Sequence, residues 1–315
     1  DRNLQAIPWE AMGDPATTAG FWGTDPHVQL VRGVTTPDAW APRDVRGPVR
    51  ILAIAPNSGE LSLNPMRAAL AEPIAAGEIE WLNPITQAMA SERTIFDAIR
   101  RSKTPHIIHF LGHAGMDPNG NPILRLADDD DGEETWLQVQ VFADELKACF
   151  AGELRLVQLE ACEGAQPGAF GSAAEIFARA GADTVIAHLW PVRADVAHTC
   201  SQAFYRALTS RNQKSGDVAR SLHDARRTIL SRFNGSAEAF SPVLYLRAPH
   251  PAFFDFQRRF ARPRTGAAKI GDREQRTRIG ILQRVRHDWI EGLLDKGPIY
   301  QNAARIMPTL ETVPS

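Results

Sequence analysis

The stretch Leu154-Arg-Leu-Val-Gln-Leu-Glu-Ala-Cys-Glu-Gly164 decides how this chain is expected to fold. Its first half is an apolar run of strand length, and its second half is a short polar turn that carries Cys162. A matching unit lies upstream, where His106-Ile-Ile-His-Phe-Leu111 runs into a glycine-rich turn that carries His113. In open parallel α/β sheets, sites form at the carboxyl ends of the strands. If the two strands are neighbours, Cys162 and His113 emerge at the same edge.

The rest of the chain alternates between strand-like and helix-like patterns. Residues 49–55, 79–82, 184–189 and 243–246 are predicted as further strands, and residues 63–75, 91–100, 142–150, 171–180, 195–208 and 217–231 as helices. Such alternation implies right-handed crossovers, and therefore an α/β fold with a mostly parallel sheet and helices on both of its faces.

Two smaller features flank this pattern. Residues 4–10 and 28–32 read as short strands at a sheet edge, because Pro8 lacks the N–H that a central strand must donate. Residues 123–126 and 135–139 predict a hairpin whose tip is the acidic run 128–132. Its four consecutive carboxylates invite a calcium interpretation, but they lack the spaced pattern of an EF-hand loop, so a solvated turn is favoured.

Four motifs fall in the order found in a known family. They are Phe110-Leu-Gly-His-Ala-Gly115, Leu159-Glu-Ala-Cys-Glu-Gly164, Ala182-Asp-Thr-Val-Ile-Ala-His-Leu-Trp-Pro-Val192 and Ala203-Phe-Tyr-Arg-Ala-Leu208. Cys162 follows His113 by 49 positions, and caspases place their His about 50 residues before a Gln-Ala-Cys-x-Gly turn. Over roughly residues 4–247 the chain resembles the CHAT domain, a caspase-like cysteine peptidase family related to separase. The resemblance implies a caspase-like peptidase domain over residues 49–248, with residues 1–48 as its N-terminal edge strands.

Amide hydrolysis needs a nucleophile, a proton carrier and donors for the oxyanion. Cys162 would supply the nucleophilic sulfur, and His113 is its candidate partner. The resemblance implies that this His chiefly protonates the leaving amine. The backbone N–H groups of Cys162 and of Ala114 or Gly115 are predicted to bind the oxyanion. No G-x-S-x-G turn occurs in the chain, so a serine α/β-hydrolase is disfavoured.

Three residues are predicted to line S1, the pocket for the side chain that precedes the scissile bond. Glu160 stands where caspases have Gln, and a carboxylate on the pocket floor predicts cleavage after Arg or Lys. The alternative is a salt-bridged, structural Glu160. The resemblance implies that Trp190 forms a pocket wall. The family usually has acidic residues directly after Trp-Pro-Val, whereas here Arg193 and Ala194 come first and Asp195 follows.

The remaining Cys and His residues favour no other kind of site. A count of three Cys argues against a disulfide framework and for a reducing cytosol. Cys149 and Cys200 fall within predicted helices, and we interpret them as core or helix-face residues. His106 and His109 could join His113 in a zinc site, but positions 106 and 109 point to opposite faces of a strand. No metal and no cofactor are therefore predicted.

Composition and charge narrow the class of protein. The chain has 315 residues, of which 43% are hydrophobic and 23% charged, as in ordinary globular proteins. A net charge of −2 gives no basic field for nucleic acid or an anionic membrane. No apolar run reaches the ~18 residues of a membrane span, and the polar start lacks the apolar core of a signal peptide. These features predict a cytoplasmic protein, and the Ala- and Arg-rich usage suggests a bacterial source.

Residues 249–315 are predicted as a linker and an amphipathic helical extension that leads to a domain outside this chain. The helix, over residues 276–294, resembles the lead-in to a bacterial NACHT-type signalling ATPase. No G-x-x-x-x-G-K-[ST] loop occurs here, so such an ATPase would be a partner in cis beyond Ser315. The absence of an initial Met agrees with a piece of a longer protein. The alternative is a helix that docks on the peptidase domain.

The predicted function is a regulated cysteine endopeptidase that acts on protein substrates. The family resemblance suggests an effector switched on by an attached sensor, in antiphage defence or programmed cell death. The alternative is a catalytically silent caspase-fold scaffold. A nucleotide-binding α/β domain is disfavoured, because no Gly-rich fingerprint follows the strand at residues 49–55.

Overall fold

The computed structural model describes residues 5, 7–13, 20–36, 40, 45, 48–56, 58–86, 91–127, 134–150, 152–161, 169–211 and 215–256. The chain divides into two compact units, residues 1–259 and 260–315, and all described residues belong to the first. The predicted acidic tip at 128–132 and the predicted helix at 276–294 lie outside the described residues. The domain boundaries given above stay predictions.

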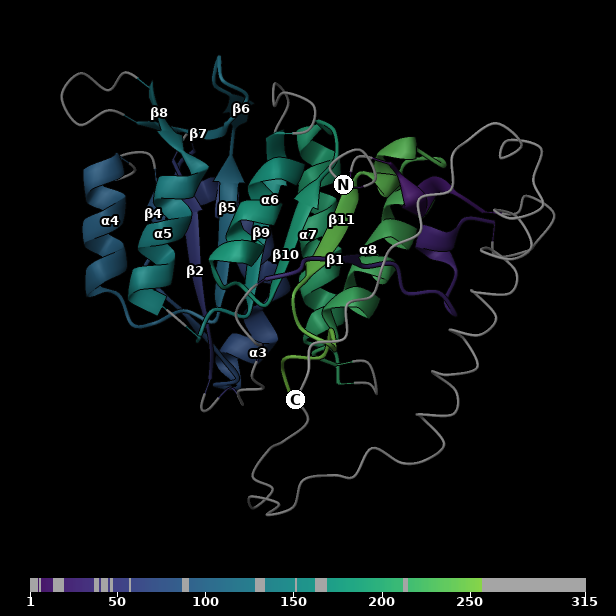
Figure 1. The fold of residues 1–315 in the computed structure, drawn as a ribbon. Helices are drawn as coiled ribbons and strands as arrows, with labels where there is room; N and C mark the ends of the chain where they lie inside the picture. The colour runs from purple at the N-terminus through teal and green to yellow at the C-terminus, as the bar shows by residue number, and fades with distance from the viewer. Residues whose placement is uncertain are drawn as a thin grey trace, which may run out of the picture. The chain divides into compact units, whose positions relative to one another are not determined.

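A mostly parallel sheet forms the centre of the described part (Figure 1). Its strands are β1 (Arg32–Gly33), β2 (Val49–Ala55), β3 (Ile79–Trp81), β4 (Ile85–Thr86), β5 (Ile107–Gly112), β9 (Leu156–Ala161), β10 (Thr184–His188) and β11 (Pro242–Leu246). The strand order is β1-β11-β10-β9-β5-β2-β3, with β4 paired to β2. Strand β11 runs antiparallel to β10, and the other pairs of this sheet are parallel.

Helices cover both faces of the sheet, as predicted (Figure 1). Helices α4 (Glu92–Arg101), α5 (Val139–Phe150) and α6 (Ala169–Ala180) pack on one face, and α2 (Asn64–Ala69), α7 (Ala194–Leu208) and α8 (Val218–Arg232) on the other. Each face of the sheet has its own hydrophobic core, and successive strand residues point alternately into one core and the other. Val157 and Leu159 face α5 and α6, whereas Leu156 faces α7. Burial on both faces explains why these strands read as continuous apolar runs.

A second, smaller sheet continues from the carboxyl end of β5. It consists of β6 (Ala114–Met116), β7 (Pro122–Ala127) and β8 (Glu134–Gln138), with antiparallel pairing throughout. In Figure 1 it lies beyond the arrowhead of β5. The predicted hairpin is thus confirmed as β7 and β8, and β6 adds a third strand. His113 is the single residue between β5 and β6.

The single helix predicted over residues 63–75 is wrong in detail. The structure has a 3-10 turn, η3 (Glu60–Leu63), followed by α2 and then α3 (Ala71–Ala75), with a break at Leu70. Pro73 explains the break, because its ring has no N–H and would clash with the carbonyl of Ala69 in a continuous helix. After the break, Pro73 lies in the first turn of α3, where a missing N–H costs nothing.

The N-terminal strand predicted over residues 4–10 is also wrong. Residues Trp9–Ala11 form a 3-10 helix, η1, and of the strand predicted over 28–32 only Arg32 enters a strand, β1. The physical reason is the burial of Glu10, which is 1% exposed. A buried carboxylate must find cationic partners, and that requirement outweighs the strand propensity of the neighbouring apolar residues.

Glu10 is held between two buried arginines. Its Oε2 accepts a hydrogen bond from Nη2 of Arg32 at 2.8 Å, and its Oε1 lies 3.7 Å from Nη2 of Arg226. Both arginines also donate to backbone oxygens: Nη2 of Arg32 to Ile7, and Nε and Nη2 of Arg226 to Pro242. The three side chains thereby tie the N-terminal segment to α8 and to the start of β11.

The helices of the described part were also compared with the requirements of a membrane span. None of those described combines the length and the apolar composition that crossing a bilayer requires.

The buried ion trio makes a prediction about stability. Replacing Glu10 by Ala leaves Arg32 and Arg226 buried without a counter-charge, so the free energy of unfolding should fall by about 3–5 kcal/mol. Urea denaturation measures the change. Glu60→Ala is the matched control, because its pair with Arg67 is exposed and should change stability by less than about 0.5 kcal/mol. Equal losses in the two variants would contradict the assignment.

Candidate active site

The register between β5 and β9 brings the two predicted catalytic turns to one edge of the sheet. The strands are parallel neighbours, and the last pair in their register is Gly112 with Ala161. His113 is the next residue on one chain segment and Cys162 the next on the other. The predicted adjacency of the two strand ends is confirmed. Cys162 itself lies outside the described residues, so the dyad stays a prediction.

His113 occupies the junction between the large sheet and the small one. Its ring is half-buried, and its carbonyl oxygen accepts a hydrogen bond from the N–H of Arg125 in β7 at 3.1 Å. The backbone at position 113 is therefore fixed on one side by β5 and on the other by β7. A fixed backbone of this kind is what a positioned catalytic imidazole requires.

The small sheet also separates the two predicted oxyanion donors. Ala114 pairs with Leu124 and Gly115 with Ile123, and the bond from Arg125 to His113 marks positions 113 and 115 as the ones whose polar groups face β7. The ladder consequently directs the N–H of Gly115 toward β7 and the N–H of Ala114 away from it. Of the two predicted donors, Ala114 is the one whose N–H points outside the β6–β7 ladder, and its role toward an oxyanion stays a prediction.

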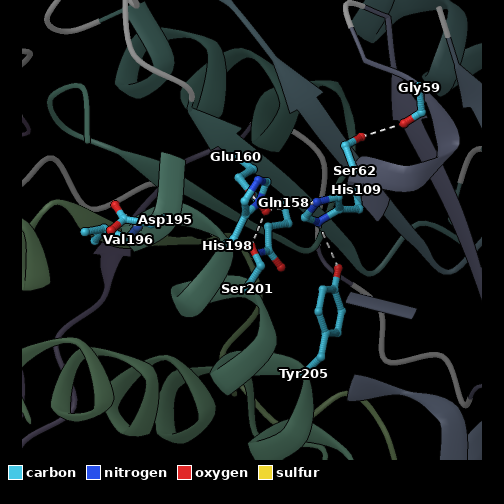
Figure 2. Close-up of polar contacts among 10 residues, drawn as sticks. All are labelled: Gly59, Ser62, His109, Gln158, Glu160, Asp195, Val196, His198, Ser201 and Tyr205. Atoms are coloured by element: carbon cyan, nitrogen blue, oxygen red, sulfur yellow. Dashed lines mark hydrogen bonds and ion pairs between the residues drawn. The ribbon is translucent and has the colours of Figure 1, made fainter. Parts of the chain in front are cut away.

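Glu160 lies in a buried polar cluster next to this edge (Figure 2). It is 2% exposed, and both of its carboxylate oxygens are bonded within the chain. Oε1 lies 2.6 Å from Nδ1 of His198 in α7, and Oε2 lies 3.2 Å from Nε2 of His109 in β5. Oε2 also accepts a hydrogen bond from the hydroxyl of Ser201.

The cluster extends one layer deeper. Gln158 donates from Nε2 to the hydroxyl of Ser201 at 2.9 Å, and the hydroxyl of Tyr205 lies 3.3 Å from Nδ1 of His109. Nδ1 of His188 is buried at the end of β10 and has no hydrogen-bond partner in the described part of the chain. The layer between the sheet and α7 is thus polar near the carboxyl ends of the strands, whereas it is apolar elsewhere.

The partners of Glu160 decide its charge. Burial alone would raise the pKa of this carboxyl, but the hydrogen bonds and positive charges of His109 and His198 hold its pKa well below the usual range. The hydrogen bond to Glu160 raises the pKa of His198, despite partial burial of the ring. Burial lowers the pKa of His188 to about 4, so that ring is neutral at physiological pH.

These contacts bear on the three predicted S1 residues. The structure does not place Glu160 on an open pocket floor, and its contacts fit the alternative of a paired structural carboxylate. Trp190 is partly buried, packs on both cores and is fixed through its N–H and carbonyl by the hydroxyl of Ser241. Asp195 is 61% exposed, accepts from the N–H of Val196, and lies apart from the cluster in Figure 2.

The partners of Glu160 were not foreseen from the sequence, although a signal for them exists. His198, Ser201 and Tyr205 recur at helical spacing on the face of α7 that packs on the sheet. Gln158 and Glu160 repeat at strand spacing on the face of β9 that meets α7. Two polar stripes within otherwise apolar elements indicate facing partners, because buried polar groups need hydrogen bonds.

Other predicted site types can be compared with the described residues. No group of three or more His, Cys, Asp or Glu side chains among them is arranged to hold a metal ion. His106 contacts Arg50, with its Nδ1 accepting from the N–H of that residue at 3.0 Å. The predicted core or helix-face positions of Cys149 and Cys200 are confirmed: Cys200 is 2% exposed, and Cys149 is partly buried on α5.

The cluster predicts a pH dependence of stability. The lowered pKa of Glu160 means that its stabilisation is present above about pH 4.5 and is lost as the pH falls through the folded value. The raised pKa of His198 means that its stabilisation is complete below about pH 6.5 and is lost as the pH rises through the folded value. His198→Ala should therefore cost more stability near pH ~5.5 than near pH ~8.5.

Urea denaturation of wild type and His198→Ala at the two pH values measures this difference. His27→Ala, a change of an exposed ring in the N-terminal segment, is the control and should leave the pH dependence of wild type unaltered. A cost for His198→Ala that is the same at both pH values would show that the ring stabilises the fold by packing alone.

Comparison with solved structures finds similar chains, among them those of separase and of a gingipain. Separase, in a complex with securin from Saccharomyces cerevisiae, is 13% identical over 78% of this chain, with a TM-score of 0.44. The Arg-specific cysteine proteinase gingipain R (RgpB) of Porphyromonas gingivalis is 12% identical over 65% of this chain, with a TM-score of 0.45. The matched parts cover 15% of the separase chain and 46% of the gingipain chain.

A match to a family model covers more of this sequence than the two structural matches do. No curated protein matches this chain. The family model of the CHAT domain matches residues 1–263, which include all of the described strands and helices. The chain therefore belongs to the CHAT domain family.

Proposed function

We propose that this protein is a cysteine endopeptidase that uses Cys162 as nucleophile and His113 as proton carrier. The observation that carries the proposal is the register of β5 and β9, which ends at Gly112 and Ala161, one residue before each member of the dyad. Membership of the CHAT domain family supports a peptidase-type fold.

The residues of this edge provide for each step of the reaction. The thiol of Cys162 gives its proton to His113 as its sulfur attacks the carbonyl carbon of the peptide. The carbonyl oxygen becomes an oxyanion that accepts hydrogen bonds from backbone N–H groups, including that of Ala114. The C–N bond breaks as His113 gives its proton to the leaving amine. Water then attacks the resulting thioester, loses a proton to His113, and releases the carboxylic acid together with the free thiol.

The other two thiols are poor nucleophiles. Burial raises the pKa of Cys200 to about 12, and burial together with Glu145 raises the pKa of Cys149. Thiolates rather than thiols react with electrophiles, so neither residue competes with an activated cysteine at neutral pH. A difference in reactivity among the three thiols therefore reports on the dyad.

The dyad predicts a selective loss of activity. Cys162→Ala should abolish cleavage of a peptide library, and His113→Ala should reduce it by at least about 10²-fold, because proton transfer to the leaving amine is lost. Cys149→Ser is the control and should retain activity. An alkylating probe should label Cys162 before Cys149 or Cys200, as read by peptide mass spectrometry. A folded protein without cleavage or selective labelling would indicate a scaffold role.

Cleavage after Arg or Lys remains part of the proposal. Its support is the carboxylate of Glu160 two residues before the nucleophile, which can pair with a basic side chain. In the structure, Nδ1 of His198 already lies 2.6 Å from Oε1 of Glu160. A basic side chain of a substrate would therefore have to displace this ring before it could pair with the carboxylate. His198 is 32% exposed, whereas His109 is 1% exposed, so His198 is the partner that a substrate side chain could displace.

This condition predicts a change of specificity. His198→Ala should uncover the carboxylate and raise the preference for Arg or Lys before the scissile bond, measured as the ratio of kcat/KM for basic and apolar peptides. Glu160→Gln should lower the same ratio. A preference for apolar residues in both wild type and His198→Ala would end the proposal of basic specificity and leave the dyad untouched.

The wider role is proposed on the family resemblance. A cytoplasmic peptidase must be held inactive until it is needed, and a C-terminal NTPase in cis could impose that control. An effector in antiphage defence or cell death fits such an arrangement. Labelling of new protein N-termini in cells that express wild type or Cys162→Ala would identify the protein substrates.

A further inference from the structure

The small sheet beside His113 has one buried and one outer face. Ala114, Leu124, Leu126 and Leu137 are at most 5% exposed and belong to the core that α5 and α6 share. The residues that alternate with these along β6, β7 and β8 lie on the opposite, outer face of the small sheet. They are Gly115, Ile123, Arg125, Trp136 and Gln138. The outer face begins two residues after His113.

Trp136 is the largest side chain on this outer face. It is 49% exposed, yet one part of its ring lies close against the backbone of β6. A Cβ atom added at Gly115 would lie 3.2 Å from Cζ3 and 3.4 Å from Cη2 of the ring, and 3.6 Å from Cγ1 of Ile123. The absence of a side chain at position 115 is what allows the indole to approach β6, the strand that follows His113.

A single exposed apolar residue is ordinary on a protein surface. Trp136 differs in its position, because it is held against the β6 backbone next to the proposed proton carrier. An aromatic ring with one edge packed and much of its surface open is the kind of group that contributes most to peptide recognition, since little conformational entropy is lost when it binds.

The order of the strands indicates which part of a substrate would reach the ring. Trp190 follows β10 on one side of β9, while His113 and the small sheet lie on the other side, beyond β5. In the proposed reaction His113 gives its proton to the leaving amine. The residues after the scissile bond must therefore leave on the His113 side, where the outer face of the small sheet continues from the site.

We propose that Trp136 is a specificity-determining residue that contacts an apolar side chain in the first two substrate positions after the scissile bond, with Ile123 beside it. This inference rests on the proposed peptidase function. The outer face receives the leaving segment of a peptide substrate, because this face is continuous with the turn that carries His113.

The test compares paired, internally quenched peptides. The two peptides of a pair share the same random mixture of residues before the scissile bond. One peptide carries Leu-Phe directly after the bond, and the other carries Gly-Gly. Wild type should prefer Leu-Phe, and Trp136→Ala should lower kcat/KM for Leu-Phe by at least about fivefold while leaving Gly-Gly unchanged. Trp136→Phe should restore most of the preference. Leu61→Ala, which removes a side chain that is 81% exposed on η3, is the control and should change neither value.

Three outcomes would overturn the inference: no preference in wild type, an equal loss for both peptides in Trp136→Ala, or no loss for either. If wild type cleaves neither peptide and an alkylating probe does not label Cys162 selectively, the proposed function fails. Binding replaces cleavage as the test whenever neither peptide is cleaved. The affinity of Cys162→Ala for the Leu-Phe peptide, measured by fluorescence anisotropy, should then fall when Trp136→Ala is added. An unchanged affinity would reject the role of the ring.

Discussion

The parallel pairing of β5 with β9 is the constraint on which the rest of the site depends. Side-chain direction alternates along a strand, so a slip of one residue in this pairing would turn His109 and Glu160 to opposite faces of the sheet. The same slip would shift the turn at His113 relative to the end of β9. Continuous burial of both strands against helices on two faces fixes the register and thereby fixes the site.

The Glu160 cluster shows how the chain places a charge beneath this edge without leaving it unpaired. A carboxylate taken out of water is costly, and two imidazoles and a hydroxyl offset that cost through hydrogen bonds. Because the donors come from β5 and α7, the cluster also holds the helix in a fixed position over β9. Specific bonds of this kind set orientation where apolar packing alone would allow sliding.

Much of the architecture could be predicted from the sequence, because strands buried on both faces are continuous apolar runs. The helix predicted over residues 91–100 is present as α4, and the hydroxyl of Ser91 caps it by accepting from the N–H of Thr94. The local errors arose where a long-range contact outweighed local preference. Glu10 lies in a 3-10 helix because Arg32 and Arg226 require it there, and no pattern around residue 10 reveals a partner so distant in sequence. The partners of Glu160 differ from this case, because the polar stripes on β9 and α7 indicate that partners exist but not which side chains pair.

The bond between Glu10 and Arg226 has a consequence for how the chain folds as it is made. The two residues are separated by roughly two hundred positions, so the carboxylate cannot meet this guanidinium until α8 has left the ribosome. During synthesis the N-terminal segment must wait, while the adjacent strands and helices of the central sheet can already assemble. Completion of this domain is therefore a late event, in which a segment made early is among the last to be secured.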